Sequence, residues 1–162
     1  MEESMMKKMV VVFFVLLAVS FSAYAQSAEV AYSVHMAGVG WSGIGMDGET
    51  SGTTGQARQI EAIRVRVISN VAGGVRYNVH ASGVGWVGWS FDNDVAGTTG
   101  QARQIEAIRV QLTGQLAQNF DIRYRVHMAG VGWSGWALNG EDAGTTGQSR
   151  RIEAIQIRLD PK

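Results

Sequence analysis

The chain contains no cysteine and a single proline, Pro161, among its 162 residues. Without cysteine, neither disulfides nor thiolate metal ligands are available, so the folded part must be held together by its apolar core. The formal net charge is zero, which removes any bulk electrostatic attraction to nucleic acid or to anionic lipid. We therefore expect no nucleic-acid partner, no metal and no cofactor.

Long hydrophobic runs are also scarce, and the one that occurs lies near the start of the chain. It extends from Met9 to Val19, after Lys7 and Lys8, and is shorter than the roughly 20 apolar residues needed to span a bilayer. Ala23-Tyr24-Ala25 then supplies small residues at both key positions of a signal-peptidase site. This pattern predicts a signal peptide over residues 1–25, a secreted or cell-surface location, and no membrane span after processing.

The rest of the chain contains one stretch that occurs three times. The copies cover residues 32–67, 77–112 and 124–159, and they align with one another without gaps. Each copy contains the runs Gly-Val-Gly-Trp, Gly-Thr-Thr-Gly-Gln and Ile-Glu-Ala-Ile. A fixed period of this size indicates a repeated supersecondary unit, because no copy can bury its apolar face alone. We expect residues 26–162 to form a single domain of three repeats.

Alternating apolar and polar residues predict strands in every copy. Tyr32, Val34 and Met36 fall on one face of an extended segment, and residues 58–67 alternate in the same way. The linker 113–123 has the composition to add a further strand, and no segment after the signal peptide has a convincing helical period. The predicted fold class is therefore all-β. Closure around a pseudo-threefold axis would hide the strand edges, as in a β-prism, which we favour, or a β-trefoil.

One carboxylate in each copy lies on the apolar face of the closing strand. Glu61 is on the same side as Ile63 and must be paired or hydrogen-bonded if it is buried. Its expected partners are Arg58, His35 or the indole N–H of Trp41. Structural roles of this kind are predicted for all the equivalent glutamates and histidines, and hydrogen bonding is favoured over metal binding: Glu61, Glu106, Glu153, His35, His80 and His127.

The tryptophans occur in pairs that are three residues apart. Residues at this spacing point to opposite faces of a strand, so one member of each pair is expected in the core. The predicted core members are the first tryptophans: Trp41, Trp86 and Trp133. The second tryptophans, Trp89 and Trp136, are candidate ligand platforms, because an exposed indole offers a flat apolar face for a sugar ring. The first copy has Ile44 at this position.

Polar groups that would bind sugar hydroxyls occur in two segments of each copy. The turn segment supplies Asp47, Glu49, Asp92, Asp94, Asn139 and Glu141, and the loop after it supplies Thr99, Gln101, Thr146 and Gln148. The alternative is that these residues cap turns and pack on the next repeat. The acids around Asp92 are too few for calcium, which takes six to eight oxygens. The arginines of the closing strands are expected to form a solvated face.

These motifs resemble the ChW repeat, named for clostridial hydrophobic repeats with a conserved tryptophan. In the third copy the similarity is carried by residues 124–127, 132–136, 139–141, 143–148 and 151–155. The resemblance covers all three copies and implies a secreted or surface-attached bacterial protein that acts near cell walls and glycans. The departure at Ile44 puts a site in the first copy in doubt.

Every candidate residue type occurs in threes, which argues against catalysis. An active site needs one constellation whose members differ in environment, whereas equal copies suit a binder that gains from avidity. We therefore expect a protein that is not an enzyme. The predicted function is a lectin-like, carbohydrate-binding or adhesion module with two or three sites, whose partner is a glycan or cell-wall polysaccharide. The alternative is a structural repeat protein that binds surface proteins.

Overall fold

The computed structural model describes residues 25–162, so the predicted signal peptide lies outside the described residues except for Ala25. Strands dominate this part of the chain, and the predicted all-β class is confirmed. The first repeat contains β1 (Ala28–Met36), β2 (Gly40–Trp41), β3 (Gly45–Met46), β4 (Ser51–Gly52) and β5 (Ile60–Ser69). The second contains β6 (Val75–Ala81), β7 (Gly85–Trp86), β8 (Ser90–Phe91), β9 (Ala96–Gly97) and β10 (Ile105–Leu112). The third contains β11 (Phe120–Met128), β12 (Gly132–Trp133), β13 (Ala137–Leu138), β14 (Ala143–Gly144) and β15 (Ile152–Pro161).

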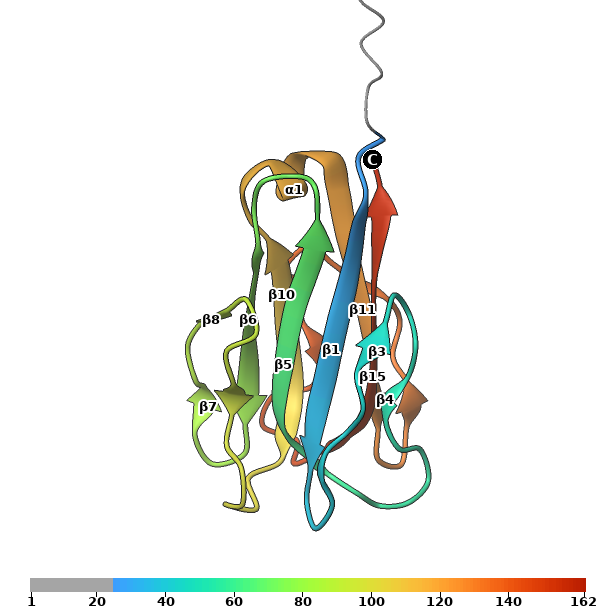
Figure 1. Ribbon diagram of the computed structural model, residues 1–162. Coiled ribbons are helices and arrows are strands. Elements are labelled where there is room, and N and C mark those ends of the chain that lie inside the picture. The colour runs from blue at the N-terminus through green and yellow to red at the C-terminus, as the bar shows by residue number, and fades with distance from the viewer. Residues whose placement is uncertain (1–24) are drawn as a thin grey trace, which may run out of the picture.

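Two long strands form the centre of each repeat. The opening and closing strands pair antiparallel over their whole length, β1 with β5, β6 with β10 and β11 with β15 (Figure 1). Equivalent tyrosines occupy equivalent registers, with Tyr32 opposite Val65 and Tyr77 opposite Val110. Two short strands then fold back onto the opening strand, as β2 and β3 do on β1. The alternation read from the sequence thus sets which residues face inward.

The remaining short strand of each repeat belongs to the sheet of another repeat. β9 pairs with β5, β14 pairs with β10, and β4 pairs with β15, so the exchange passes once through all three repeats. Each of these strands ends in a glycine, and a Cβ on Gly97 would lie 2.3 Å from the carbonyl oxygen of Glu61. Glycine is needed there because the two backbones approach so closely. Each five-stranded sheet therefore contains residues from two repeats.

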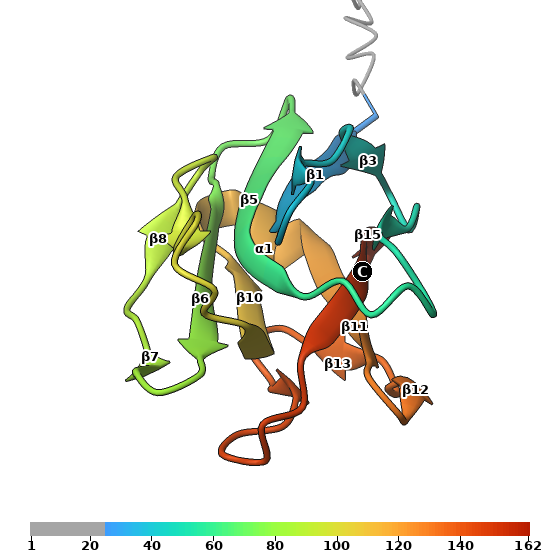
Figure 2. The same ribbon diagram turned by 90° about the horizontal axis from the view of Figure 1, so that it is seen from below.

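A single apolar cluster joins the three sheets. Figure 2 shows the three long strand pairs around a shared interior, and the side chains of Tyr32, Tyr77 and Tyr124 are buried there. Each tyrosine hydroxyl donates a hydrogen bond to a backbone carbonyl of its own repeat: Glu49, Asp94 and Glu141. Burial raises the pKa of each tyrosine to about 12, because the charged phenolate would lose its hydration.

The linker between the second and third repeats contains the helix α1 (Gly114–Asn119). The sequence suggested an additional strand here, and that interpretation is wrong for the first half of the linker. Leu116 is buried and fixes the helix against the core, at the end of the molecule where the chain terminates (Figure 1). The second half, from Phe120, lengthens β11 instead. No helix within residues 25–162 has the length and apolarity to cross a membrane.

Candidate functional site

The three glutamates of the Ile-Glu-Ala-Ile runs are buried, as predicted. Glu61 and Glu106 are 2% exposed and Glu153 is 3% exposed. In each repeat one carboxylate oxygen lies 3.3–3.4 Å from Nδ1 of the equivalent histidine. The other oxygen accepts a hydrogen bond from a residue two positions earlier, and these donors are Gln59, Gln104 and Arg151. The histidine contact is within reach of an ion pair but lacks the alignment of a hydrogen bond.

The first tryptophans do not lie in the core, so that prediction is wrong. Trp41, Trp86 and Trp133 are half-buried at the surface, and each packs edge-on against the histidine of its repeat at 5.5 Å between ring centres. The residues before them explain the placement. Gly40 and its equivalents have positive φ angles at the start of a two-residue strand, so the indole turns across the outside of the sheet.

Arginines stack on the tryptophans, which the sequence reading missed. The guanidinium carbon lies 4.6 Å from the ring centre for Arg64 over Trp41, and 4.0 Å for Arg109 over Trp86. Arg64 and Arg109, which the sequence predicted to lie on a solvated face, therefore make cation–π contacts. Each pair joins a closing strand to a short strand distant in the chain, so no local spacing reveals it.

The two tryptophans of the third repeat share one arginine. The guanidinium carbon of Arg125 lies 4.9 Å from the Trp133 ring and 4.7 Å from the Trp136 ring. The predicted placement on opposite faces is therefore wrong for this pair. The prediction assumed a continuous strand, whereas residues 134–136 leave the strand conformation between β12 and β13.

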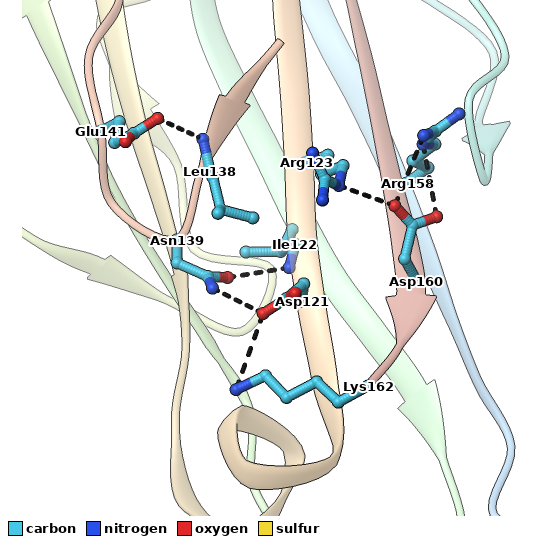
Figure 3. A network of polar contacts seen from close by, with 9 residues as sticks. All are labelled: Asp121, Ile122, Arg123, Leu138, Asn139, Glu141, Arg158, Asp160 and Lys162. Carbon is cyan, nitrogen blue, oxygen red and sulfur yellow. Dashed lines mark hydrogen bonds and ion pairs between the residues drawn. The ribbon is translucent and has the colours of Figure 1, made fainter.

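The side chains of the turn residues, which are acids except for Asn139, accept local hydrogen bonds from backbone N–H groups. Asn139 Oδ1 accepts from the backbone N–H of Ile122 at 2.9 Å, and Glu141 Oε2 accepts from the N–H of Leu138 at 2.9 Å (Figure 3). Asp47, Glu49 and Asp92 make the equivalent contacts in the other repeats. These bonds support the capping alternative, although a carboxylate has acceptor capacity left after one bond.

A pair of equivalent grooves brings some of the predicted site residues together. The groove of the third repeat is lined by residues 134–137 and 141–144, which include Trp136, Glu141 and Asp142. The groove of the first repeat is lined by residues 42–45 and 49–52, which include Ile44 and Glu49. We call these the turn grooves. Each combines the second-tryptophan position with a turn acid and with glycine-rich backbone.

The loop residues predicted to bind sugar lie outside these grooves. Thr99, Gln101, Thr146 and Gln148 are exposed and line neither groove. The threonine that precedes Thr99 or Thr146 packs on a neighbouring repeat, as where the Thr98 N–H donates to the carbonyl of Glu61 at 3.0 Å. Its hydroxyl is buried without a hydrogen-bond partner, and the same holds for Thr53 and Thr145. This loop therefore packs on another repeat, as the packing alternative predicted, although the contacted repeat is the preceding one in the cycle and not the next.

The three repeats match a known family. The family described as Clostridial hydrophobic W, abbreviated ChW, matches residues 35–68, 80–114 and 127–161. The chain belongs to the ChW family. No curated protein and no solved structure matched it. The matched segments begin at the equivalent histidines and run through the tryptophans to the closing strands, so they include the histidine–glutamate pair of every repeat and the turn grooves of the first and third repeats.

Proposed function

We propose that this ChW protein is a secreted, multivalent carbohydrate-binding module, with a glycan or cell-wall polysaccharide as its partner. The observation that supports this most directly is the turn groove of the third repeat, where Trp136 lies beside Glu141 and Asp142. Sugar recognition needs an aromatic face for the C–H groups and polar acceptors for the hydroxyls. Both are present within one groove.

The second repeat supplies the same platform residue. Trp89 is 38% exposed, and Arg76 stacks on it at 4.6 Å. The first repeat has Ile44 instead, which is 62% exposed and has no flat aromatic face. We therefore assign sugar-binding sites to the second and third repeats.

We further propose that the cyclic strand exchange closes the three repeats into one prism-like domain. Equal sites would then be held at fixed distances on a rigid body. Binding to a surface that displays many copies of a glycan gains from such an arrangement, because the second contact is effectively intramolecular. Secretion through the predicted signal peptide would bring these sites to the cell surface.

The test uses the protein after removal of residues 1–25. A glycan array identifies the ligand, and calorimetric titration with a monovalent form of that ligand should give two sites. Trp89→Ala and Trp136→Ala should each remove one site, with the melting temperature nearly unchanged. Three equal sites, or loss of all sites in either variant, would contradict the proposed platforms. Mass spectrometry should show that the secreted protein begins at Gln26.

Binding to surface proteins is a second candidate, favoured by another repeated feature. The tips of the turns that follow β1, β6 and β11 carry equivalent valines, and Val39, Val84 and Val131 are 53%, 54% and 52% exposed. Three apolar tips of this kind suit protein contact better than sugar contact. Two results together would establish this function instead. The unmodified protein would bind no glycan on the array, and replacing all three valines by serine would abolish its attachment to cells.

A further inference from the structure

A different groove lies where the first repeat meets the second. It is lined by Ser33, Trp41, Ile44, Arg64 and Arg66 of the first repeat, together with Asn93 of the second. Its volume of about 370 Å³ falls within the range of about 300–1,000 Å³ that is usual for small-molecule sites. We call it the arginine groove. No acidic residue lines it.

The two arginines of this groove have no anionic partner. Within residues 25–162, neither Arg64 nor Arg66 forms an ion pair. The Nε–H of Arg64 is buried and donates no hydrogen bond, while the guanidinium stacks on Trp41. A buried donor without an acceptor costs free energy that a bound anion would recover. Arg66 is exposed on the same strand, two residues further on.

Equivalent arginines in the other repeats are neutralised. Arg109, which corresponds to Arg64, forms an ion pair with Asp142 of the third repeat. Arg158, which corresponds to Arg66, lies 3.4 Å from Asp160. Within residues 25–162 the first repeat thus has two arginines without an ion pair at these positions, whereas each of the other repeats has one paired arginine and one glutamine, Gln111 or Gln156.

The space beside Ser33 is open in the first repeat, whereas an arginine side chain fills the corresponding space in the third repeat. Arg125 occupies the space between Trp133 and Trp136, whereas the corresponding residue of the first repeat is Ser33. Ile44 replaces the second tryptophan on the other side. Small residues therefore leave room for a ligand against the two arginines.

We propose that the arginine groove binds a sugar residue that carries a negative charge, as a carboxylate or a phosphate. Arginine recognises either group through charge-assisted, two-pronged hydrogen bonds. Trp41 and Ile44 supply apolar surface for the sugar ring, and Ser33 and Asn93 supply hydroxyl and amide groups for its oxygens. This inference rests on the proposed function in that the ligand is a glycan, but it uses the repeat that lacks the second tryptophan.

The first experiment compares charged and neutral probes by calorimetry on the chain after residue 25. The probes are methyl glucuronide, glucose 6-phosphate and methyl glucoside. At least one charged probe should bind with one site, with an affinity at least about tenfold above that of the neutral probe. Its affinity should fall as salt is added, because the attraction is electrostatic. Preference for only the carboxylate or only the phosphate identifies the source of the charge. Equal affinity for charged and neutral probes would overturn the proposal.

Two variants then locate the charged-sugar site. Arg66→Gln should weaken binding about tenfold, and the matched variant Arg158→Gln in the third repeat should leave it unchanged. Ser33→Arg copies Arg125 and should abolish binding by filling the groove, although it adds a positive charge. Charged-sugar binding that survives Ser33→Arg in a folded protein would show non-specific attraction and refute the site. Melting curves establish that each variant is folded.

A cross-comparison separates this inference from the proposed function. Trp136→Ala should remove a neutral-glycan site and leave charged-sugar binding intact, and Arg66→Gln should do the reverse. If neutral glycans fail to bind while the charged sugar binds as described, the turn grooves are wrong and the arginine groove stands. Loss of charged-sugar binding in a folded Trp136→Ala variant would overturn the arginine groove.

Discussion

Arg109 of the second repeat and Asp142 of the third form a two-pronged ion pair across the boundary between their repeats, with Nη2 donating to Oδ2 at 3.1 Å. The hydrogen bonds that Arg109 donates to Asp142 raise the pKa of the guanidinium above its usual value. At the boundary between the third and first repeats the equivalent contact is an uncharged hydrogen bond, in which Gln156 Nε2 donates to Thr50 Oγ1 at 2.9 Å. The remaining boundary places Val95 at the position equivalent to Asp142, so the three boundaries differ in polarity at one shared position.

Val95→Asp should therefore provide Arg64 with the partner that Arg109 has. Both side chains of the existing pair are about two-fifths exposed, so the gain in stability should stay below about 1 kcal/mol. Charged-sugar binding in the arginine groove should be lost, because the new carboxylate competes for the guanidinium. Melting temperature and calorimetry check the two effects, with Val95→Asn as the uncharged control. A variant that binds the charged sugar as strongly as the parent would contradict the competition.

Glu106→Ala should destabilise the protein by about 1–3 kcal/mol. The glutamate is buried, and its removal leaves Gln104 without its acceptor and His80 without the carboxylate 3.3 Å from its Nδ1. Glu106→Gln keeps the volume and one acceptor oxygen, so it should cost less. Denaturant unfolding measures both changes. An alanine variant as stable as the parent would show that the pairing contributes nothing.

Gly97→Ala should cost at least about 2 kcal/mol, because a Cβ would approach the Glu61 carbonyl oxygen to 2.3 Å and the residue has φ of +98°. Gly100→Ala is the matched control, since its φ is +70° but nothing lies within 4 Å of the added carbon. That variant should lose only about 1 kcal/mol from backbone strain. Equal losses in thermal unfolding would mean that the contact between β9 and β5 is looser than described.

Alkaline pH should unfold the protein through its three buried tyrosines. Their pKa rises from 10 in the unfolded chain to about 12 in the folded protein. The stabilisation is therefore complete below pH 10 and is lost as the pH rises towards 12, at about 1.4 kcal/mol per pH unit for each tyrosine. Unfolding titrations between pH 9 and 12 measure the slope, which Tyr77→Phe should reduce by one third. An unchanged slope in that variant would exclude Tyr77 as a contributor.

Ile44→Trp should create a third sugar site, because it restores the aromatic platform in the turn groove of the first repeat. The side chain at this position is 62% exposed, so stability should change by less than about 0.5 kcal/mol. Titration with the monovalent ligand should rise from two sites to three. Ile44→Leu is the aliphatic control and should leave two. A count that stays at two for the tryptophan variant would mean that the platform alone is insufficient.

Local patterns were enough to predict the long strands and their inward faces. The alternation around Tyr32 and the carboxylate of Glu61 on an apolar face both led to the observed burial. Two-residue strands carry no periodicity, so the exchange of β4, β9 and β14 had no signal beyond the glycines that end them. A spacing rule for strands also failed at Trp133 and Trp136, because the backbone between them is irregular.

The candidate site was predicted less completely than the fold, for a related reason. Trp136 and Glu141 were both predicted as ligand-binding residues, and they line one groove. The stacking of Arg125 on both tryptophans and the open space beside Ser33 depend on comparing three copies whose side chains differ at one position. The effect of these differences on stacking and on open space can be seen only in a structure that places the strands side by side.

The pairing of β4 with β15 also constrains how the chain can reach its native state. β4 belongs to the first repeat, whereas its partner β15 is the last strand described. The first and last thirds of the polypeptide must therefore meet before the last of the three sheets is complete, which makes this a late and slow contact by loop-closure entropy. A chain that emerges from the ribosome one repeat at a time would therefore leave β4 without its partner strand until β15 has been synthesised.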